Sequence, residues 1–512
     1  MSSPTTSIQS ATSHSTAADV DVDVVIVGAG ISGIGAACHL RRELPHETFV
    51  ILEGREAIGG TWDLFRYPGI RSDSDLHTFA YEFKPWTSDN AIADACEILD
   101  YLEETVEEYG LAPHIRFGHR VLGADFSAQD ARWTLRVQRA DTAETFELTC
   151  RVLFSAAGYY DYAAGHLPAF EGRDSFHGAI VHPQQWPEDL DYAGRRVVVI
   201  GSGATAVTLI PAMAGTAAHV TMLQRSPSYV MSLPAKDPIA NGLRRALPAK
   251  LAYRITRRMN VARQRLIYDL SMRHPTLVRR LIRALTKHQL PAGYAVDTHF
   301  NPRYNPWEER LCAVRNGDLF KAIREGRASI VTDRIVRFTE RGILLESGAE
   351  LEADVIVTAT GLNLLAFGGM ELSIEGEPVD LGDAVAYKSM MLSGVPNFAF
   401  AVGYTNSSWT LKVDLVCEHL CRLLAHMDAR GYASVVPVLE DETMERRPLL
   451  DFHAGYVRRA VDVFPKQGSR GPWTLEMSYA HDRRRLRKGP VEDAALRFAS
   501  SDSCTPGELL AA

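Results

Sequence analysis

The sequence predicts an α/β fold with two Rossmann-like dinucleotide-binding domains, the second inserted into the first, and an additional helical insertion. Two segments, "VDVVIVGAGISGIGAACHL" and "RRVVVIGSGATAVTLIPAMA", each have the pattern of a buried parallel strand, a glycine-rich turn and a helix. A third segment, "ELEADVIVTATGLN", predicts a strand that returns the chain from the inserted domain to the first one. A chain of 512 residues is also too long for one core and favours two or three domains.

The first glycine-rich turn places its glycines as a dinucleotide pyrophosphate requires. Gly28 allows the tight turn, Gly30 lets the backbone approach the pyrophosphate, and Gly33 lets helix and strand pack closely. The next strand, "TFVILE", ends at Glu53. A carboxylate there can accept hydrogen bonds from ribose hydroxyls and repels a 2′-phosphate, so this unit predicts an FAD site.

The second unit ends its second strand with a different side chain. Its turn runs from Gly201 to Ala206, and the strand "HVTMLQRS" brings Arg225 and Ser226 to the position that an acid holds in the first unit. A guanidinium can bind a 2′-phosphate, so this unit predicts an NADPH site. Two NAD sites, or a degenerate duplicate of the first unit, are the alternatives.

These assignments divide the chain into segments. We expect the FAD domain in residues 21–165 and 350–500 and the NADPH domain in residues 166–229 and 301–349. We expect a helical insertion at 230–300 and tails at 1–20 and 501–512, the first of them disordered because it is rich in Ser and Thr.

Composition excludes several classes of protein. No apolar run is long enough to span a membrane, and the first twenty residues lack the basic start and apolar centre of a secretory signal. The seven cysteines form no CxxC pair and no zinc spacing, which predicts reduced thiols, no metal site and a cytoplasmic location. Cys417 and Cys421 lie one helical turn apart, where core packing is the expected role.

Residues 242–289 are strongly basic, with thirteen Lys or Arg and one Asp in a chain whose net charge is −8. Apolar residues at helical spacing predict amphipathic helices. These helices are either an ordinary solvated face or a surface that attracts an anionic cofactor or a membrane, so peripheral membrane association is an open alternative. No aromatic residues are interleaved at base-stacking spacing, so we expect no nucleic acid partner.

The two cofactors together define the chemistry that we expect. NADPH and FAD in one chain indicate hydride transfer to flavin. Without a CxxC pair or a metal cluster to take the electrons, dioxygen is the expected acceptor.

Two further segments resemble the fingerprints of Baeyer–Villiger monooxygenases. "FHGAIVHPQQWP", which reads as a loop between the two units, matches the first fingerprint through Phe176, Gly178, His182, Trp186 and Pro187. "GGTWDLFRYPGIRSD" matches the second through Gly59, Gly60, Trp62, Tyr67, Pro68, Gly69 and Asp73. Stretches such as "NPRYNPWEERLC", "TATGLNL" and "VGYTNSSWTLK" are similar to the ethionamide-activating subgroup, and the resemblance covers about residues 21 to 500.

The resemblance implies roles for individual residues. Arg310 would be the catalytic cation beside the flavin, Asp73 the acid that orients it, and His182 a linker residue that helps the NADPH domain move. The alternatives are a surface ion pair of Arg310 with Glu308 or Glu309, a helix N-cap for Asp73 and a backbone-bonded loop histidine for His182. Asn406 and Trp409 are candidates for the substrate pocket, although core packing would also explain Trp409.

One departure from the family pattern concerns the coenzyme. Some relatives have Lys immediately before the catalytic Arg, and this chain has Glu309 there. NADPH selection then depends mainly on Arg225 and Ser226. The complete set of cofactor-binding candidates is Gly28, Gly30, Ser32, Gly33, Glu53, Gly60, Thr61, Trp62, Asp63, Asp73, Val121, Gly201, Ser202, Gly203, Ala204, Thr205, Ala206, Gln224, Arg225, Ser226 and Gly361.

The expected activity is insertion of one oxygen atom beside a ketone carbonyl to give an ester or lactone, through a C4a-peroxyflavin. The partners would be O2 and a small ketone or a sulfur-containing substrate, because such peroxides also oxidise sulfides and thioamides. The alternatives are an N- or S-hydroxylating flavin monooxygenase without ketone activity, and a non-catalytic redox sensor that binds both dinucleotides.

Overall fold

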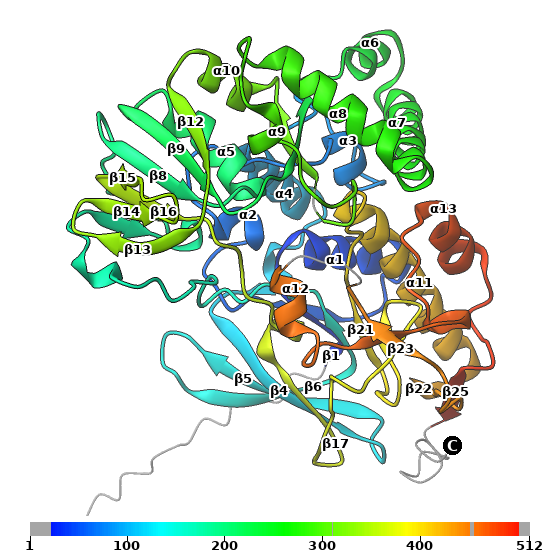
Figure 1. Cartoon of the computed structure of the whole chain (residues 1–512). Helices are drawn as coiled ribbons and strands as arrows, with labels where there is room; N and C mark the ends of the chain where they lie inside the picture. The colour runs from blue at the N-terminus through cyan, green and yellow to red at the C-terminus, as the bar shows by residue number, and fades with distance from the viewer. Residues whose placement is uncertain (1–21, 310, 451–454, 501–512) are drawn as a thin grey trace, which may run out of the picture.

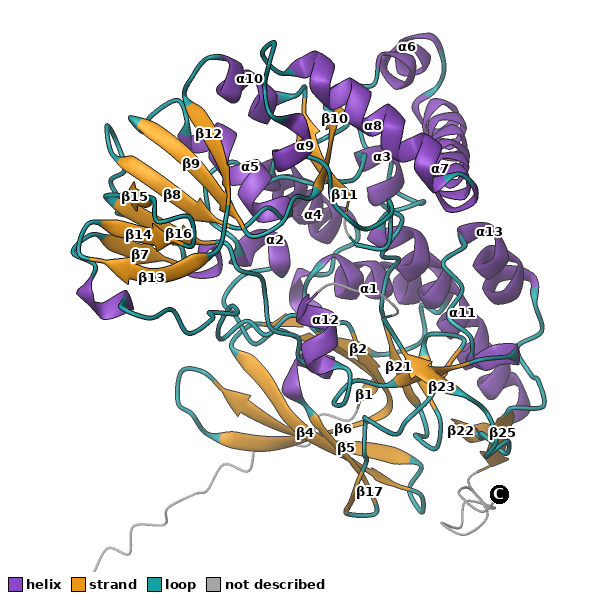
Figure 2. Ribbon diagram, viewed as in Figure 1, coloured by secondary structure: helices purple, strands orange, loops and turns teal. Residues whose placement is uncertain are grey.

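A computed structural model describes residues 22–309, 311–450 and 455–500, so both expected tails lie outside the described residues. Two separate sheets organise the chain, one at the upper left of Figure 2 and one at its lower centre. This arrangement confirms the α/β fold with two Rossmann-like units.

The first sheet is mixed, and its strand β1 is hydrogen-bonded in parallel to β2 and β6. In spatial order it contains β18 (Glu377–Pro378), β17 (Glu371–Ile374), β4 (His119–Ser127), β5 (Arg132–Arg139), β6 (Thr145–Ser155), β1 (Val22–Val27), β2 (Phe49–Leu52) and β3 (Ile115–Arg116), and β21 (Phe398–Phe400) also pairs with β6.

The second sheet is parallel throughout and corrects one expected domain boundary. Its order is β12 (Ala328–Thr332), β9 (His219–Gln224), β8 (Arg196–Ile200), β16 (Val355–Thr358) and β7 (Ala179–Val181). The sequence predicts residues 350–358 in the FAD domain, but β16 pairs with β8 and β7 in this sheet. The chain therefore returns to the first sheet only after Thr358.

The segment "FHGAIVHPQQWP" is also more regular than a loop. Residues Ala179–Val181 form the edge strand β7, and Pro183–Gln185 form the short 3-10 helix η3. The strand forms because β16 offers it a partner, and that long-range contact is absent from the local sequence.

Helices of the first unit are α1 (Ile31–Glu43), α2 (Thr61–Leu64), α3 (Leu76–Phe79), α4 (Ala95–Glu108), α11 (Trp409–Arg430), α12 (Gly455–Ala460) and α13 (Tyr479–Asp482). The second unit has α5 (Ala204–Met213), α9 (Val296–His299) and α10 (Asp318–Arg324). Buried side chains of α1 and α11 pack together against the first sheet, and those of α5 pack against the second.

The basic segment is helical, as expected. It folds as α6 (Pro238–Ala246), α7 (Ala249–Arg273) and α8 (Pro275–Gln289), which lie together at the upper right of Figure 1. Among the described residues, no helix is both long enough and apolar enough to cross a bilayer.

Smaller pairings complete the structure. The parallel pair β10 (Tyr229–Leu233) and β11 (Leu311–Arg315) brackets the helical insertion. The other small sheets are β13 (Ile335–Thr339), β14 (Gly342–Leu345) and β15 (Glu350–Glu352); β19 (Ala386–Tyr387) and β20 (Met391–Leu392); β22 (Tyr432–Pro437) and β25 (Leu496–Ser500); and β23 (Arg446–Pro448) and β24 (Lys466–Gly468).

Candidate functional site

A cavity of about 1140 Å³ is lined by residues of both Rossmann-like units and of the helical insertion. The first unit contributes the N-terminus of α1, the end of β2, the loop through residues 59–75 and the loop 404–409. The second unit contributes the N-terminus of α5. Because an α-helix N-terminus carries unpaired N–H donors and a partial positive charge, the two termini make this cavity suited to anionic ligands.

The first glycine-rich turn has the geometry that its sequence predicted. Gly28 has a φ of +104°, and a Cβ at Gly33 would lie 1.8 Å from the carbonyl oxygen of Gly28. Both positions therefore require glycine. A Cβ at Gly30 would meet only Gly60, at 3.6 Å, so the backbone of Gly30 faces open space in the cavity.

Glu53 is buried at the cavity wall directly after β2. Its two carboxylate oxygens accept hydrogen bonds from the backbone N–H groups of Ala29, at 2.7 Å, and Arg55, at 3.0 Å. Burial raises the pKa of Glu53, and these two N–H donors oppose that rise. The carboxyl group thus ties the end of β2 to the glycine-rich turn beside which a ribose would lie.

The second glycine-rich turn repeats this arrangement at the start of α5. Gly201 has a φ of +134°, and a Cβ there would approach the carbonyl oxygen of Ala359 to 2.4 Å. Nothing lies within 4 Å of a Cβ at Gly203, so a ligand can approach its backbone. Ala204 and Thr205 line the cavity, whereas Ala206 is buried in the core of the second unit.

The residues expected to bind the dinucleotide ribose in the second unit have different environments. Arg225 and Ser226 are exposed directly after β9. Gln224 is buried, and its amide nitrogen donates to the backbone oxygen of His299 and to Thr332, so this side chain has a structural role. Ser202 is hydrogen-bonded to Ser228 at 2.8 Å, which fixes the turn against the loop that carries Arg225.

The fingerprint loop after Gly59 connects the two units. Gly60, Thr61 and Trp62 line the cavity. Asp63 is an ion-pair partner of Arg55 at 2.5 Å and also contacts Arg66.

Farther along the same loop, two contacts reach α5. Gly69 has a φ of +78°, and a Cβ there would lie 2.7 Å from the Cβ of Ala212. Tyr67 is buried, and burial raises its pKa to about 12. A hydrogen bond to Thr205 opposes this rise. The loop therefore fixes the second unit against the cavity.

Asp73 and Asp75 have separate roles. Asp73 has an exposed side chain and lines the cavity. The N-cap of α3 is Asp75, whose carboxylate accepts from the backbone N–H of Thr78 at 3.1 Å. The N-cap alternative for Asp73 is therefore wrong, because Asp75 holds that position.

His182 does not line the cavity. It lies where the segment that enters the second unit meets the segment that leaves it, and we call these two segments the linkers. Its Nδ1 accepts from the backbone N–H of Gln184 at 3.2 Å, and its Nε2 lies 3.2 Å from the carbonyl oxygen of Gly361. These partners require a neutral ring with the proton on Nε2, and burial lowers the pKa of His182 accordingly. His182 thus joins the segment that enters the second unit to the segment that leaves it.

Arg310 lies outside the described residues. Its described neighbours Trp307 and Leu311 both line the cavity. Glu308 accepts from the backbone N–H and side-chain amide of Asn305, at 2.8 and 2.7 Å.

The loop 404–409 supplies the two pocket candidates. Asn406 lines the cavity and donates its amide N–H to the backbone oxygen of Met477 at 3.0 Å. Within the described part of the chain, its buried Oδ1 has no hydrogen-bond partner. Trp409 also lines the cavity, donates to Ser32 at 2.8 Å and lies 5.4 Å from the ring of Tyr159. Trp409 is therefore both a wall residue and a packing residue.

Several residues of the cavity wall were not candidates from the sequence. Tyr162 is hydrogen-bonded to Thr61 at 3.3 Å, and Gln264 of α7 donates to Asp75 at 2.7 Å and accepts from Ser407 at 3.0 Å. Trp307 has a φ of +75°, and its buried indole N–H has no hydrogen-bond partner among the described residues. Tyr162 and Gln264 lie outside every quoted motif. Trp307 lies in the quoted stretch "NPRYNPWEERLC", but its place in the cavity wall depends on tertiary contacts that this stretch does not reveal. Val121, which was a candidate, does line the cavity.

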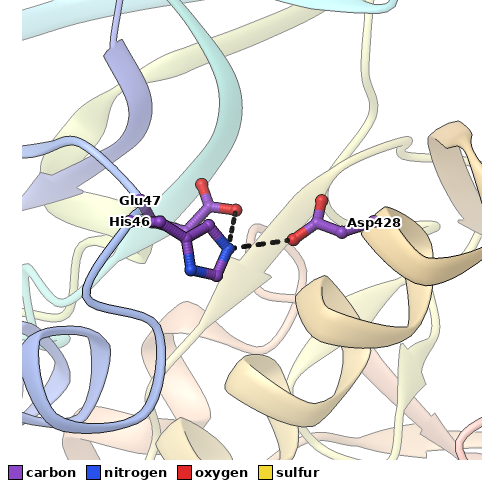
Figure 3. A group of neighbouring side chains, drawn as sticks. All are labelled: His46, Glu47 and Asp428. Carbon is purple, nitrogen blue, oxygen red and sulfur yellow. Dashed lines mark ion pairs between the residues drawn. The ribbon is translucent and has the colours of Figure 1, made fainter.

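One group of described residues has the spacing of metal ligands, and Figure 3 shows it as His46, Glu47 and Asp428. Arg151 already binds both carboxylates, at 2.6 Å from Glu47 and 2.6 Å from Asp428. His46 is exposed at the edge of this ion pair. The cluster is a structural ion pair, and a divalent cation would have to displace the guanidinium.

Comparison with known proteins confirms the family resemblance. Residues 21–395 match the family model described as flavin-binding monooxygenase-like. The chain is 54% identical over 479 residues to the FAD-containing monooxygenase EthA of Mycobacterium tuberculosis, an alignment that covers 93% of this chain and 98% of that protein.

Two solved structures share the fold. A steroid monooxygenase bound to NADP matches with a TM-score of 0.73 and 24% identity, over 94% of this chain and 100% of that one. A cyclohexanone monooxygenase bound to ε-caprolactone matches with a TM-score of 0.70 and 21% identity, over 93% of this chain and 99% of that one.

Proposed function

Since the chain belongs to the flavin-binding monooxygenase-like family, we propose that it consumes NADPH and O2 to insert an oxygen atom beside a ketone carbonyl. The product is an ester or a lactone, and the second oxygen atom leaves as water. The observation that carries this proposal is one cavity that is lined by the first glycine-rich turn and by Ala204 and Thr205 at the start of α5.

The first unit fits FAD. The space beside the backbone of Gly30 is open, and together with the N-terminus of α1 it suits a pyrophosphate. Glu53 suits a ribose that has no 2′-phosphate. The relative EthA is named as FAD-containing, which supports this assignment.

The second unit fits NADPH. Gly203 leaves room for the pyrophosphate at the start of α5, and the exposed Arg225 and Ser226 suit the 2′-phosphate. The steroid monooxygenase of the same fold is bound to NADP, and this supports the coenzyme.

The chemistry of the insertion needs charge stabilisation and exclusion of water. A bound flavin, reduced by NADPH, supplies activated dioxygen. Arg310 is the proposed permanent cation, and it stabilises the negative charge that develops on the carbonyl oxygen as the substrate is attacked. Asp73, which lines the cavity, is the proposed acid that orients Arg310.

His182 is proposed as a positioning residue. Its bonds to Gln184 and Gly361 hold together the two linkers of the second unit, so they influence where the nicotinamide can lie. This role requires no contact between His182 and substrate.

The ketone reaction is supported by a neighbour in structure. Cyclohexanone with one oxygen atom inserted beside its carbonyl is ε-caprolactone, the ligand in the cyclohexanone monooxygenase of matching fold. Oxidation of sulfides or thioamides is a second proposed activity, supported by the similarity of stretches such as "VGYTNSSWTLK" to the ethionamide-activating subgroup and by 54% identity to EthA.

The test is product analysis with labelled oxygen. Purified enzyme is incubated with NADPH, ¹⁸O2 and a panel of ketones and sulfides, and the products are analysed by mass spectrometry. We expect esters that carry one ¹⁸O atom. Oxidation of sulfides or amines with every ketone refused would instead establish a hydroxylating monooxygenase, and no oxygen uptake at all would favour a redox sensor.

Substitution of Arg310 tests the proposed cation. We expect Arg310→Met to lower kcat for ketones by about 10²–10³-fold, because a fixed charge that stabilises developing negative charge commonly contributes that much. Glu309→Gln is the matched control and should retain activity. Ester formation by Arg310→Met at the wild-type rate would reject Arg310 as the catalytic cation.

A further inference from the structure

An unusual surface covers the outer side of helices α6, α7 and α8. Among the described residues, most of the large apolar side chains that are exposed belong to these three helices. On α8 they form one stripe, Leu277, Leu281 and Leu285, each more than half exposed and spaced four residues apart. Val278 and Ile282, one residue later in each turn, are buried against the protein. The leucine stripe therefore faces away from the core.

Helix α7 continues this surface. Leu251 and Ile255 lie one turn apart near its start, and Leu266 and Leu270 lie one turn apart near its end. Leu266 is 67% exposed, more than any other large apolar side chain in the described part of the chain. We call the exposed apolar residues of α6–α8 the apolar surface.

Basic side chains border the apolar surface. On α8 and the end of α7, Arg273, Arg280 and Lys287 recur every seven residues, and on α7 Arg254 and Arg258 lie one turn apart. All five are exposed, and within the described residues none has an ion-pair partner. This local excess of positive charge contrasts with the net charge of −8 of the whole chain, so the remainder of the protein is strongly acidic.

The cavity extends to the same helices. Ile239 of α6 and Ile267 of α7 line the cavity, and they are 56% and 40% exposed. Both belong to the apolar surface. The cavity therefore reaches the apolar surface at these two side chains.

We infer that the apolar surface docks on an anionic phospholipid bilayer and that apolar substrates enter the cavity from that bilayer. Leucine side chains that insert at the lipid interface, bordered by cations that contact phosphate headgroups, are the chemistry that such a membrane recognises. The acidic remainder of the protein is repelled by the same membrane, and this repulsion fixes the orientation.

A second copy of the chain fits this surface less well. A two-fold dimer would place the same patch against itself and bring the unpaired arginines of both copies together. Anionic headgroups instead neutralise those charges.

The entry path deepens the proposed function and rests on it, because it specifies the substrate class as ketones or sulfides that dissolve in membranes. Docking itself does not depend on turnover. The two parts can therefore be tested separately.

Docking is tested by flotation of the FAD-loaded enzyme with vesicles of phosphatidylglycerol and phosphatidylcholine, and with vesicles of phosphatidylcholine alone. We expect binding to the anionic vesicles that weakens as salt is raised. The triple variant Arg254→Gln, Arg258→Gln, Arg280→Gln should bind about a hundredfold more weakly, at about fivefold for each cation. The control triple Arg337→Gln, Arg430→Gln, Arg484→Gln removes exposed arginines elsewhere and should bind as the wild type does.

The apolar contribution has its own variant pair. Leu266→Gln with Leu281→Gln should reduce binding to anionic vesicles, whereas Val336→Gln with Val463→Gln, at exposed apolar sites outside helices α6–α8, should not. Equal binding by all variants, or no binding to anionic vesicles at low salt, would overturn docking. Self-association that the leucine variants abolish, without any vesicle binding, would identify a dimer interface instead and also overturn it.

The entry path is tested with two ketones, one carried in anionic vesicles and one soluble in water. The arginine triple should lower turnover of the vesicle-borne long-chain ketone and leave turnover of the water-soluble ketone unchanged. An equal effect on both ketones would reject entry from the bilayer. If neither ketone is oxidised, the proposed function fails while the flotation result stands.

Discussion

His182 occupies a space that only glycine at position 165 leaves open. A Cβ at Gly165 would lie 1.9 Å from Cε1 of the His182 ring and within 2.5 Å of both ring nitrogens. An alanine there would displace the imidazole without changing its chemistry. Because His182 binds Gln184 and Gly361, its displacement separates the two linkers of the second unit.

We therefore expect Gly165→Ala to slow the reduction of flavin by NADPH by about tenfold or more, as a misplaced binding group does. His182→Ala should have a similar effect, and the FAD content of both variants should stay normal. Stopped-flow absorbance measures the rate. Gly215→Ala is the control, since the nearest atom to its Cβ would be 3.9 Å away. A wild-type rate in Gly165→Ala would show that the position of His182 has no influence on this step.

At the scale of elements, a buried ion pair joins α11 to α13 behind the cavity wall. Lys412 donates to Asp482 at 2.8 Å, and both side chains are at most 2% exposed. Tyr404, which lines the cavity, donates to the same carboxylate oxygen at 2.7 Å. Burial lowers the pKa of Lys412, and the negative charge of Asp482 opposes this shift.

Lys412→Met should destabilise the enzyme by about 3–5 kcal/mol, because it leaves the charge of Asp482 buried without its cation. The free energy of unfolding is measured by urea titration of the FAD-loaded enzyme. The double variant Lys412→Met, Asp482→Leu removes both charges and should recover most of the loss. If the double variant is as unstable as Lys412→Met, the loss of stability comes from altered packing and not from the unpaired charge.

The middle of α11 carries a histidine that makes stability depend on pH. His419 is buried, its Nδ1 donates to the backbone oxygen of Leu486 at 2.8 Å, and burial, with a contribution from Lys388, lowers its pKa to about 3. The folded pKa lies below the unfolded value of about 6.5, so the unfolded chain binds a proton more readily. This contribution to stability is complete above pH 6.5 and is lost as pH falls toward 3.

His419 should therefore account for about 2 kcal/mol of the stability lost between pH 7.5 and pH 5.0, at about 1.4 kcal/mol per pH unit below 6.5. His419→Asn keeps an N–H donor but cannot titrate. Urea titrations should therefore show that this variant loses about 2 kcal/mol less of its free energy of unfolding between pH 7.5 and pH 5.0 than the wild type does. His288→Asn, at an exposed position on α8, is the control. An unchanged pH dependence in His419→Asn would contradict this assignment.

The elements that were predictable from sequence are those with local signals. A strand followed by Gly28 or Gly201 is recognisable because the turn itself requires glycine. Pairing of β16 with β8 was not predictable, because the same apolar residues would suit the first sheet equally well. The N-cap of α3 shows the same limit, since Asp73 and Asp75 are both plausible caps and only the structure places Asp73 at the cavity.

At the scale of the whole molecule, the fingerprint loop sets the position of the second unit relative to the cavity. Gly69 touches α5, where a Cβ would lie 2.7 Å from the Cβ of Ala212 and 3.1 Å from the backbone oxygen of Thr208. Helix α5 in turn presents its N-terminus to the cavity. A side chain at position 69 would therefore push α5 away from the first unit while leaving the FAD-binding turn in place.

Gly69→Ala should weaken NADP⁺ binding by about tenfold, the equivalent of roughly 1.4 kcal/mol, without loss of FAD. Titration calorimetry gives the NADP⁺ affinity, and flavin absorbance gives the FAD content. The φ of +78° alone would strain an alanine, so Gly326→Ala is the matched control, with a φ of +70° in the second unit and no atom within 4 Å. If Gly69→Ala and Gly326→Ala weaken NADP⁺ binding equally, backbone strain explains the effect. If only Gly69→Ala does, contact between the loop and α5 positions the second unit, as the geometry requires.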